Sequence, residues 1–504
     1  MALRLMIQGT MSGVGKSFIV TALCRIFRRM GFRVAPFKFQ NMSLNSYVTV
    51  EGLEIARSQA IQAMAAGVEP SYRMNPILLK PTGDERCQVV IRGKVFGYRD
   101  YYKPYSTDFL TGILEEDFGY LDRNFDIVVI EGVGSPAEIN IKDRDFSNMF
   151  VAKMTNTPVI IVGDIFRGGV FASLFGTYML LGESEKKLVK GFIINKFIGN
   201  STILKRGIEE LEKLTGIETL GVVPYTDFRI DEEDTISDVL EKGIGKGNVK
   251  VAILKLPHIS NYTDIEPLYY IPDVEIRYVN PTLNLDKYDI LIIPGTKNTI
   301  EDLLYLKRYK FDREIKRLRD MGKVIVGICG GFQMLGEIIE DPYNLESNFG
   351  KATGLGLLKV KTVMLKEKIT SRVKAEIIGN IPFLQKLENR VIEGYEIHKG
   401  FSEIVGEESP FALVFERNSV SVTIPDGAVS KDGMVFGTYV HGIFENSKFL
   451  LGLVNFVRER KGLGPIDGIE SYKRVREAMF DRLADLVENY CDIEKILAIM
   501  KRYS

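Results

Sequence analysis

The 504-residue sequence contains no tryptophan, few histidines and cysteines, and no excess of either charge. Its 66 basic and 66 acidic side chains give a net charge of zero, without the basic surplus of a general nucleic-acid binder, so we expect no nucleic-acid partner. No apolar run approaches the roughly 18 residues that span a bilayer. Residues Met1–Gln8 run directly into a glycine-rich loop, which leaves no room for a signal peptide. These absences predict a cytoplasmic protein with no membrane partner.

The four cysteines are far apart and none belongs to a C-x-x-C pair, so the sequence suggests neither a disulfide framework nor a structural zinc cage. They are Cys24, Cys87, Cys329 and Cys491. Imidazole chemistry is restricted to three positions because the chain has only three histidines. These are His258, His398 and His441.

The composition, 45% apolar and 26% charged, is that of an ordinary globular protein, and the length predicts two or three domains. Strand and helix patterns alternate up to about residue 235 and again from Val249, which predicts an α/β fold with parallel sheets. The glycine-rich stretch at 241–250 is the best linker candidate. We therefore expect one domain over residues 1–240, a second over 249–447, and a helical C-terminal extension over 448–504.

The expected elements follow from short β-rich runs and from apolar residues at helical spacing. In the first half, strands are expected at 3–8, 33–37, 126–130, 158–163 and 191–195, and helices at 18–30 and 53–66. In the second half, strands are expected at 249–255, 289–294, 323–328 and 436–440, and a helix from Ser471 onward.

A phosphate-binding loop follows the first expected strand. In Gly9-Thr-Met-Ser-Gly13-Val-Gly15-Lys16-Ser17 the glycines let backbone N–H groups converge on phosphate oxygens at a helix N-terminus. Lys16 is expected to reach the terminal phosphates of ATP and Ser17 to coordinate Mg²⁺. Five residues separate Gly9 from Gly15, one more than in the common spacing. The alternative is a glycine-rich turn that binds nothing.

Acidic residues are needed beside the metal of a hydrolysable nucleotide. Glu131 ends a buried strand, at the edge of an open α/β sheet where ligands bind. Its carboxylate is costly there unless it meets a cation or hydrogen-bond donors. Glu54, at the start of the helix expected at 53–66, is the second candidate. For both residues a purely structural role is the alternative.

Polar side chains crowd the end of the second strand. Lys38 is suited to stabilise a developing phosphoryl charge, and the neighbouring amides and hydroxyls to grip substrate carboxylates. These neighbours are Gln40, Asn41, Ser43 and Asn45. The alternative is an Asn/Ser turn held by local side-chain-to-backbone hydrogen bonds.

A nucleophile elbow is expected in the second half. Gly327-Ile-Cys329-Gly330-Gly331 follows an apolar strand and precedes a helix, an arrangement that exposes a reactive thiol. His441 ends another strand and is chosen over His398 and His258 as its proton carrier. The backbone N–H groups at Gly295 and Gly330 are the candidates for an oxyanion hole.

Several longer motifs together resemble a known family. They are GTMSGVGKS, FKFQNMSLNSYVT, EIARSQAIQA, EGVGSPAEIN, PHISNYTDIEPL, GICGGFQMLG and GTYVHGIFEN. Through nearly the whole chain the sequence is similar to the cobyric acid synthases. In these enzymes a P-loop domain similar to dethiobiotin synthetase is fused to a class I glutamine amidotransferase domain. The resemblance implies ATP- and glutamine-dependent amidation of the b, d, e and g carboxylates of adenosylcobyrinic acid a,c-diamide, a corrinoid.

The resemblance also implies residue roles. Cys329 matches the nucleophile of the family and His441 its partner, Lys16 and Ser17 match the phosphate loop, and Glu131 and Glu54 match acidic residues near Mg²⁺. Most class I amidotransferases orient the histidine by a His-x-Glu motif. Here residue 443 is isoleucine and the next acid is Glu445, so the group that orients His441 is left unassigned.

Two other functions are weighed against this one. Cobyrinic acid a,c-diamide synthase shares both domain types, and a nucleotide switch of the ParA/MinD type shares the first. Such switches usually carry a lysine where this loop has Met11, and they lack an amidotransferase partner. The sequence leaves open the order of the amidations, the ammonia route, the corrinoid pocket and whether the chain forms a homo-oligomer.

Overall fold

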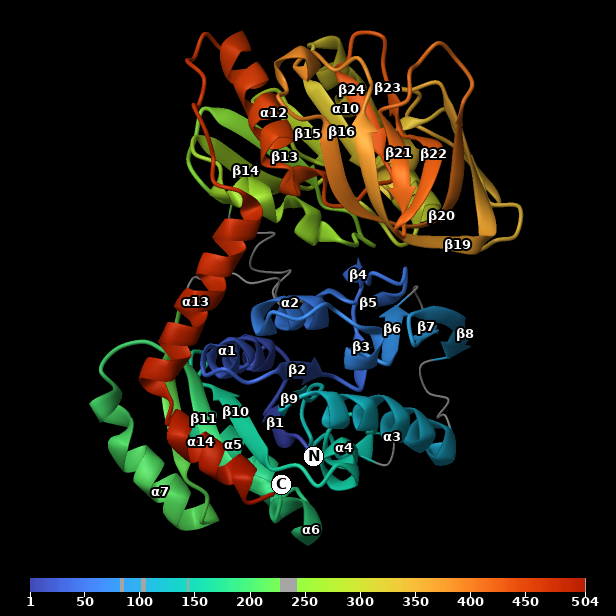
Figure 1. Ribbon diagram of the computed structural model, residues 1–504. Coiled ribbons are helices and arrows are strands. Elements are labelled where there is room, and N and C mark those ends of the chain that lie inside the picture. Colours follow the sequence, from blue (N-terminus) through green and yellow to red (C-terminus); the bar gives the residue numbers. More distant parts are fainter. Residues whose placement is uncertain (82–85, 101–105, 143–144, 227–242, 504) are drawn as a thin grey trace. The chain divides into compact units, whose positions relative to one another are not determined.

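The computed structural model describes residues 1–81, 86–100, 106–142, 145–226 and 243–503. The chain divides into two compact units (Figure 1). The first, here the nucleotide unit, comprises residues 1–43, 54–235 and 476–504, and the second, here the amidotransferase unit, comprises 44–53 and 236–475. Both units are therefore discontinuous in sequence. The boundary expected at residue 240 lies outside the described residues.

The nucleotide unit is built on a six-stranded sheet in which every neighbouring pair is parallel. In spatial order its strands are β12 (Thr219–Pro224), β11 (Val189–Phe197), β10 (Val159–Asp164), β1 (Leu3–Gly9), β9 (Ile127–Glu131) and β2 (Val34–Phe37).

Both faces of this sheet are covered. Along β1, Leu5 and Ile7 enter one buried apolar cluster while Met6 enters another, as the period of two in a strand requires. The carboxyl ends of the strands carry the loops at one common edge. The helices of the unit, apart from the C-terminal pair, are α1 (Lys16–Arg29), α2 (Arg57–Ala66), α3 (Thr107–Asn124), α4 (Met149–Met154), α5 (Val170–Met179), α6 (Glu183–Lys186) and α7 (Lys205–Thr215).

The helix expected at 53–66 begins four residues later than predicted. Glu54–Ala56 form the short strand β5, and Ala56 is extended (φ −65°, ψ 142°) before α2 starts at Arg57. Pattern reasoning also missed a mixed four-stranded sheet in this unit. Its strands are β3 (Gln40–Met42), β6 (Ile77–Pro81), β7 (Arg86–Ile91) and β8 (Lys94–Asp100).

The C-terminal helices α13 (Tyr472–Tyr490) and α14 (Ile493–Lys501) complete the nucleotide unit from Arg476 onward. Phe480, Leu483 and Met500 are fully buried in the cluster that also holds the apolar face of α1. At the edge of this contact, the Arg25 guanidinium donates to both carboxylate oxygens of Asp481, at 2.7 and 2.9 Å. The predicted helical tail is thus confirmed.

The amidotransferase unit has a second six-stranded sheet, parallel except for one edge strand. In order the strands are β14 (Val274–Val279), β13 (Val249–Leu254), β15 (Ile290–Ile293), β16 (Val324–Ile328), β24 (Val435–Thr438) and the antiparallel β23 (Ala428–Val429). The helices of this unit are α9 (Thr299–Arg308), α10 (Phe311–Asp320), α11 (Gly330–Leu335) and α12 (Ser447–Arg460).

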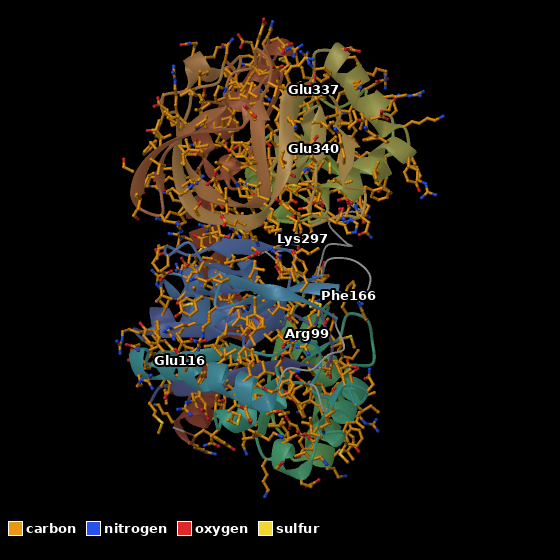
Figure 2. The ribbon with its side chains drawn as sticks, turned by 90° about the vertical axis from the view of Figure 1, so that its right-hand side faces the viewer. Arg99, Glu116, Phe166, Lys297, Glu337 and Glu340 are labelled. Carbon is orange, nitrogen blue, oxygen red and sulfur yellow. The ribbon has the colours of Figure 1, made fainter. Side chains whose placement is uncertain are left out.

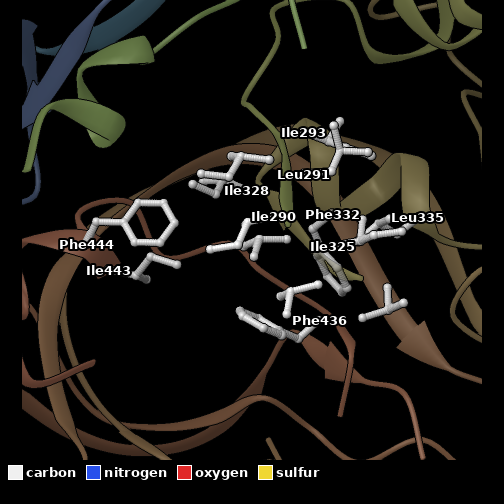
Figure 3. Close-up of a cluster of buried hydrophobic side chains, with 14 of the residues drawn as sticks. Ile290, Leu291, Ile293, Ile325, Ile328, Phe332, Leu335, Phe436, Ile443 and Phe444 are labelled. Carbon is white, nitrogen blue, oxygen red and sulfur yellow. The ribbon is translucent and has the colours of Figure 1, made fainter. Parts of the chain in front are cut away.

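The core of this unit lies directly beneath its candidate site. Ile290, Ile325 and Phe436 come from three neighbouring strands and pack together with Phe332 of α11 (Figure 3). All are at most 1% exposed. Because protein cores are close-packed, the strand ends and the loops above them are held in fixed positions.

A further sheet, missed by pattern reasoning, wraps one side of the amidotransferase unit. Its strands are β17 (Ile338–Glu340), β18 (Lys351–Thr353), β19 (Val360–Ile377), β20 (Val391–Ile404), β21 (Ala412–Arg417) and β22 (Val420–Asp426). Glu337 and Glu340 mark the β17 region in Figure 2. The unit also contains β4 (Ser46–Val48), from the N-terminal half of the chain.

The predicted α/β architecture of two parallel-sheet domains with a helical tail is confirmed. Across the described ranges, no helix is both long and apolar enough to cross a membrane.

Candidate active sites

The phosphate loop joins β1 to α1 as the sequence predicts. Gly13 and Gly15 adopt φ values of 75° and 96°, a region that favours glycine. A Cβ on Gly15 would lie 2.2 Å from the side-chain amide nitrogen of Asn195, so a larger residue would displace that side chain and would also be strained by the positive φ. The Lys16 ammonium donates to the carbonyls of Met11 and Gly134, at 3.0 and 3.1 Å, and its side chain curls over the loop.

Two residues that sequence reasoning missed support the loop from β11. Asn195 donates to the carbonyl of Val14 (2.8 Å), and Lys196 donates to that of Gly13 (2.5 Å) while pairing with Asp164 (3.2 Å). Their only signal in the sequence was their position at the end of an expected strand. Nearby, Phe166 (Figure 2) stacks on Tyr225 with centroids 5.2 Å apart, and both rings are about half exposed.

Glu131 is the centre of a buried polar cluster. Its carboxylate accepts hydrogen bonds from Ser17 (2.8 Å), Lys38 (2.8 Å) and Gln62 (2.5 Å). Burial opposes the charge, but the Lys38 ammonium and these hydrogen bonds outweigh it and hold the pKa of Glu131 below its usual range. The structure thus brings together three of the predicted residues, Ser17, Lys38 and Glu131. Gln62, in EIARSQAIQA, was not predicted.

Ser17 and Glu131 offer oxygen donors of the kind that Mg²⁺ takes alongside substrate phosphates. The hydroxyl and the carboxylate already touch, so the residues present fit this ion. The carboxylate of Glu54, the second acidic residue predicted near the metal, pairs with Lys80 at 2.6 Å, and both side chains are buried. Among the described residues, no group of three or more His, Cys, Asp or Glu forms a metal cage.

The polar residues after the second strand are divided between the units. Gln40, Asn41 and Ser43 belong to the nucleotide unit, whereas Asn45 belongs to the amidotransferase unit. Asn41 donates to Ser58 (3.2 Å) and to Gln59 (3.0 Å) on α2. Since Gln59 in turn meets Gln62 (3.4 Å), a buried chain of polar side chains leads from Asn41 to the Glu131 cluster.

The elbow at Cys329 has the strained backbone that a nucleophile turn requires. Cys329 sits between β16 and α11 with φ 52° and ψ −110°, a conformation that costs of order 1–3 kcal/mol and persists only when its surroundings enforce it. A Cβ on Gly331 would lie 2.0 Å from the carbonyl oxygen of Ile293, so glycine is required beside the nucleophile. The thiol points to the carbonyl of Ile397 on β20 (3.9 Å) and Cys329 is 8% exposed.

His441 meets both the nucleophile and a carboxylate. Its Nδ1 lies 2.6 Å from Asp264 Oδ2, and the other oxygen of Asp264 accepts the backbone N–H of Gly442 (3.0 Å). Nε2 has no hydrogen bond of standard geometry to a described residue. Burial opposes protonation, but the charge and hydrogen bond of Asp264, together with the Cys329 thiol, raise the pKa of His441 to about 10. The ring is therefore an imidazolium at neutral pH, the form that stabilises a thiolate.

The other two histidines have different surroundings. His258 pairs with Asp302 (2.7 Å), which raises its pKa, and Asp302 also holds Thr296 (2.5 Å). His398 stacks on Tyr439 with centroids 3.7 Å apart, and burial lowers its pKa to about 3. Of the three, His441 is the one whose pKa the Cys329 thiol raises.

The loops of the predicted oxyanion hole adjoin. A Cβ on Gly330 would lie 3.1 Å from the backbone nitrogen of Thr296, and one on Gly295 would lie 3.5 Å from Cε1 of His441. The glycine that follows the nucleophile therefore adjoins the Gly295–Thr296 loop, and Gly295 adjoins the His441 ring. Lys297, which follows this loop, is labelled in Figure 2.

Asp264 is the main residue that sequence reasoning missed. It lies 177 positions before His441, in the segment Thr263-Asp264-Ile265. Sequence reasoning placed an orienting acid only in the residues just after His441, where most class I amidotransferases carry it. The only signal for Asp264 was its presence in PHISNYTDIEPL, one of the motifs that carried the resemblance.

Two domain families match the chain. Residues 5–236 match the CobQ/CobB/MinD/ParA nucleotide binding domain, and residues 250–449 match the CobB/CobQ-like glutamine amidotransferase domain. These matches agree with a phosphate loop in one unit and a Cys–His–Asp arrangement in the other.

Known proteins match from end to end. Cobyric acid synthase of Caldanaerobacter subterraneus subsp. tengcongensis is 54% identical, over 100% of this chain and 99% of its own length. That of Thermoanaerobacter sp. is 53% identical, over 100% of both, and that of Clostridium acetobutylicum is 47% identical, over 99% of this chain and 98% of its own length. Because these matches extend over the whole chain and both domain families are present, the chain is a glutamine-dependent amidoligase and belongs to the cobyric acid synthase family.

Proposed function

We propose that this enzyme converts the b, d, e and g carboxylates of adenosylcobyrinic acid a,c-diamide into carboxamides, with ATP and glutamine as co-substrates. The observation that carries the proposal is the presence, in one chain, of the Cys329–His441–Asp264 arrangement and of the cluster around Glu131. The first is suited to release ammonia. The second is suited to activate a carboxylate.

Glutamine hydrolysis is assigned to the amidotransferase unit. The Cys329 thiolate attacks the side-chain amide carbon, the N–H groups at Gly295 and Gly330 receive the developing oxyanion, and the imidazolium of His441 protonates the departing ammonia. A thioester remains on Cys329. His441, now neutral, takes a proton from water, which attacks the thioester and releases glutamate. Asp264 keeps the ring oriented through both steps.

Carboxylate activation is assigned to the nucleotide unit. A carboxylate is a poor acylating agent because oxide is a poor leaving group, so its oxygen first attacks the γ-phosphorus of ATP to give an acyl phosphate and ADP. Lys16 and Lys38 stabilise the phosphoryl charge. Ser17 and Glu131 would hold Mg²⁺, which neutralises charge on the phosphate oxygens. Ammonia then attacks the acyl carbon and phosphate leaves.

Binding of the corrinoid, whose carboxylates accept the ammonia, is assigned to the polar residues that follow β2. Gln40, Asn41 and Ser43 are proposed to hold the corrinoid carboxylates, with Asn45 as a further contact. The buried polar chain from Asn41 through Gln59 to Gln62 supports this assignment, because it leads to the carboxylate that Lys38 and Ser17 share. Glu54, which pairs with the buried Lys80, is proposed as the further acidic residue near Mg²⁺. The aromatic pair Phe166–Tyr225 offers a surface on which a nucleotide base can stack.

The deciding experiment is mass spectrometry of the product formed from cobyrinic acid a,c-diamide, ATP and glutamine. Each amidation exchanges a hydroxyl for an amino group, so the mass change counts the new amides. Four are expected. A product without new amides, together with conversion of cobyrinic acid to its a,c-diamide, would instead identify cobyrinic acid a,c-diamide synthase.

Two variants separate the two sites. We expect Cys329→Ala to make product from ammonium salts but not from glutamine, because only the nitrogen source is lost. Lys16→Ala should make no product from either source and still hydrolyse glutamine. Loss of both activities in Cys329→Ala would contradict this division.

A further inference from the structure

Residues 44–53 leave the nucleotide unit and return to it within ten positions. Both ends are fixed there by backbone hydrogen bonds, from Ser43 to Leu79 (3.0 Å) and from Glu54 to Gly93 (3.1 Å). The segment itself belongs to the amidotransferase unit. We call residues 44–53 the bridging segment.

The bridging segment forms a small apolar cluster with strand β20. Its members are Tyr47 and Val48 from the segment and Tyr395 and Ile397 from the strand. Val48 is fully buried, and the rings of Tyr47 and Tyr395 lie 5.8 Å apart. The cluster is separate from the large core of the unit, so the strand residues depend on the segment for this part of their packing.

Both strand members touch a catalytic residue. Tyr395 stacks on the His441 imidazole, with centroids 5.0 Å apart and planes inclined by 13°, and the two residues exchange backbone hydrogen bonds of 3.2 and 2.8 Å. The carbonyl of Ile397 lies 3.9 Å from the Cys329 sulfur. The ring of Tyr47 therefore packs against the ring of Tyr395, which in turn stacks on His441, the proposed general acid–base.

Polar contacts fix the segment on two sides. Arg372 of β19 donates to the Tyr47 hydroxyl and, at 3.1 Å, to the carbonyl of Val48, with its guanidinium carbon 5.3 Å from the centre of the Tyr47 ring. The backbone N–H of Ser46 donates to the Asn261 side chain (2.8 Å). The backbone carbonyl of Asn261 in turn accepts the backbone N–H of Asp264 (3.1 Å), whose carboxylate contacts the His441 ring.

We propose that the bridging segment positions the His441 imidazole, through Tyr47 and Tyr395 on one side and through Asn261 and Asp264 on the other. Tyr47 is a positioning residue, since it touches neither glutamine nor the reacting atoms. Because both ends of the segment are fixed beside the residues assigned to the acceptor carboxylate, occupation of that site changes the rate at which glutamine is hydrolysed. This last step rests on the proposed function.

The positioning role is tested with Tyr47→Ala, Tyr47→Phe and the control Glu51→Ala, an exposed position of the same segment. Displacement of the His441 imidazole lowers the rate of proton transfer but leaves glutamine binding unchanged. Tyr47→Ala should therefore lower kcat for glutamine hydrolysis by about tenfold or more with little change in KM. Synthesis from ammonium salts should stay within about twofold, because it bypasses the glutaminase site. Tyr47→Phe, which keeps the ring, should recover most of the rate.

A second readout needs neither ATP nor a corrinoid. The rate of Cys329 alkylation by iodoacetamide, followed against pH, reports the thiolate and its imidazolium partner. Tyr47→Ala should shift this profile and Glu51→Ala should not. Arg372→Gln, which releases the segment without altering Tyr47, should shift it in the same direction. Profiles that match the wild type in both variants would overturn the positioning role.

The coupling is tested separately in the wild-type enzyme. Addition of ATP and cobyrinic acid a,c-diamide should change the rate of glutamine hydrolysis, and Tyr47→Ala should abolish the response. A wild-type rate that ignores both ligands, in a protein that does amidate the corrinoid, would overturn the coupling alone. A protein that amidates no corrinoid would overturn the proposed function and leave the alkylation result standing.

Discussion

Two buried carboxylates, Glu131 and Asp264, show how single residues prepare the two sites. An ionised carboxylate in a protein interior is costly unless cations or hydrogen-bond donors compensate it. Glu131 is compensated by Lys38, and Asp264 by the imidazolium of His441. Lys38 and His441 are both assigned to the reaction. The ion pair that stabilises each buried carboxylate therefore also holds a catalytic cation in place.

We predict that Asp264→Asn lowers glutamine hydrolysis by about 10²-fold or more, because the amide can no longer stabilise the imidazolium. Asp264 raises the pKa of His441, so its removal lowers that pKa. The imidazolium is lost as pH rises through the pKa, and the alkaline limb of the rate profile should therefore move to lower pH. The pH dependence of kcat measures this. An alkaline limb in its original place would count against Asp264 as the orienting group.

We predict that Glu131→Gln reduces synthesis from glutamine and from ammonium salts alike, by about 10²-fold or more, since Lys38 loses its counter-charge and the site loses a negatively charged oxygen donor for Mg²⁺. ADP release measures the effect. Glutamine hydrolysis without ATP should be unchanged. Asp126→Asn is the matched control, because Asp126 precedes the same strand β9 at its opposite end and pairs only with the exposed Arg33 among its described salt-bridge partners. Equal losses in both variants would contradict a specific role for Glu131.

At the residue scale, local patterns predicted the residues that lie within one strand–loop–helix motif. Cys329 and Lys16 were recognisable because the turn around each demands particular neighbours. Asp264 was not, because its partner lies 177 positions away and only the fold brings the two together. The role of each predicted site residue remains a prediction until variants are measured.

At the scale of elements, the C-terminal helices are an integral part of the nucleotide unit. The buried residues of α13 and α14 share one cluster with α1, and salt bridges from Arg25 and Arg29 to Asp481 and Asp485 border the contact. The helix that begins at the phosphate loop is therefore covered by the last residues of the chain.

We predict that Leu483→Ala destabilises the nucleotide unit by about 2–5 kcal/mol, because Leu483 is fully buried in this cluster and its removal leaves a cavity. The unfolding transition of the nucleotide unit should shift to a lower temperature in thermal unfolding and to a lower urea concentration in urea unfolding. Asn489→Ala, at an exposed position of the same helix, should change stability by less than about 0.5 kcal/mol. A similar small effect of Leu483→Ala would mean that α13 does not complete this core.

The elements that sequence patterns predicted are mostly the fully buried parallel strands, which have continuous apolar runs, whereas the less buried parallel edge strands β12 and β14 were missed. Predictions were poorer where polar residues are buried. Helix α2 buries Arg57, Ser58, Gln59 and Gln62, so its pattern has no apolar face and its start was placed too early. The long antiparallel strands β19 and β20 alternate buried and exposed positions only in part, and their pairing is set by contacts distant in sequence.

At the scale of the whole molecule, the two activities should depend on being in one chain. Ammonia is largely protonated at neutral pH, and only the free base attacks an acyl phosphate. We predict that a mixture of Cys329→Ala and Lys16→Ala proteins makes much less amide from glutamine at neutral pH than the wild type does, and that the deficit shrinks as pH rises. Product counted by mass spectrometry over a pH series measures this. A mixture as active as the wild type at neutral pH would show that ammonia passes freely through solution.

The number of domains and their order along the chain were predictable, whereas the assignment of segments to units was not. The expected ranges 1–240, 249–447 and 448–504 treat each unit as continuous and remain a prediction. In the structure, residues 44–53 belong to the amidotransferase unit although they lie within the N-terminal half of the chain. Residues 476–504 belong to the nucleotide unit although they follow the amidotransferase unit in sequence. Cytoplasmic location likewise stays a prediction.

The discontinuity of the nucleotide unit has a consequence for how the protein is made. Translation proceeds from the N-terminus, so β1, the phosphate loop and α1 leave the ribosome first, yet Phe480, Leu483 and Met500, which complete the buried cluster that holds the apolar face of α1, are among the last residues to emerge. All parts of the amidotransferase unit are synthesised before them. The half of the enzyme that begins the chain is therefore the half that finishes folding last, and until then its apolar helix face must be kept from aggregation by other means.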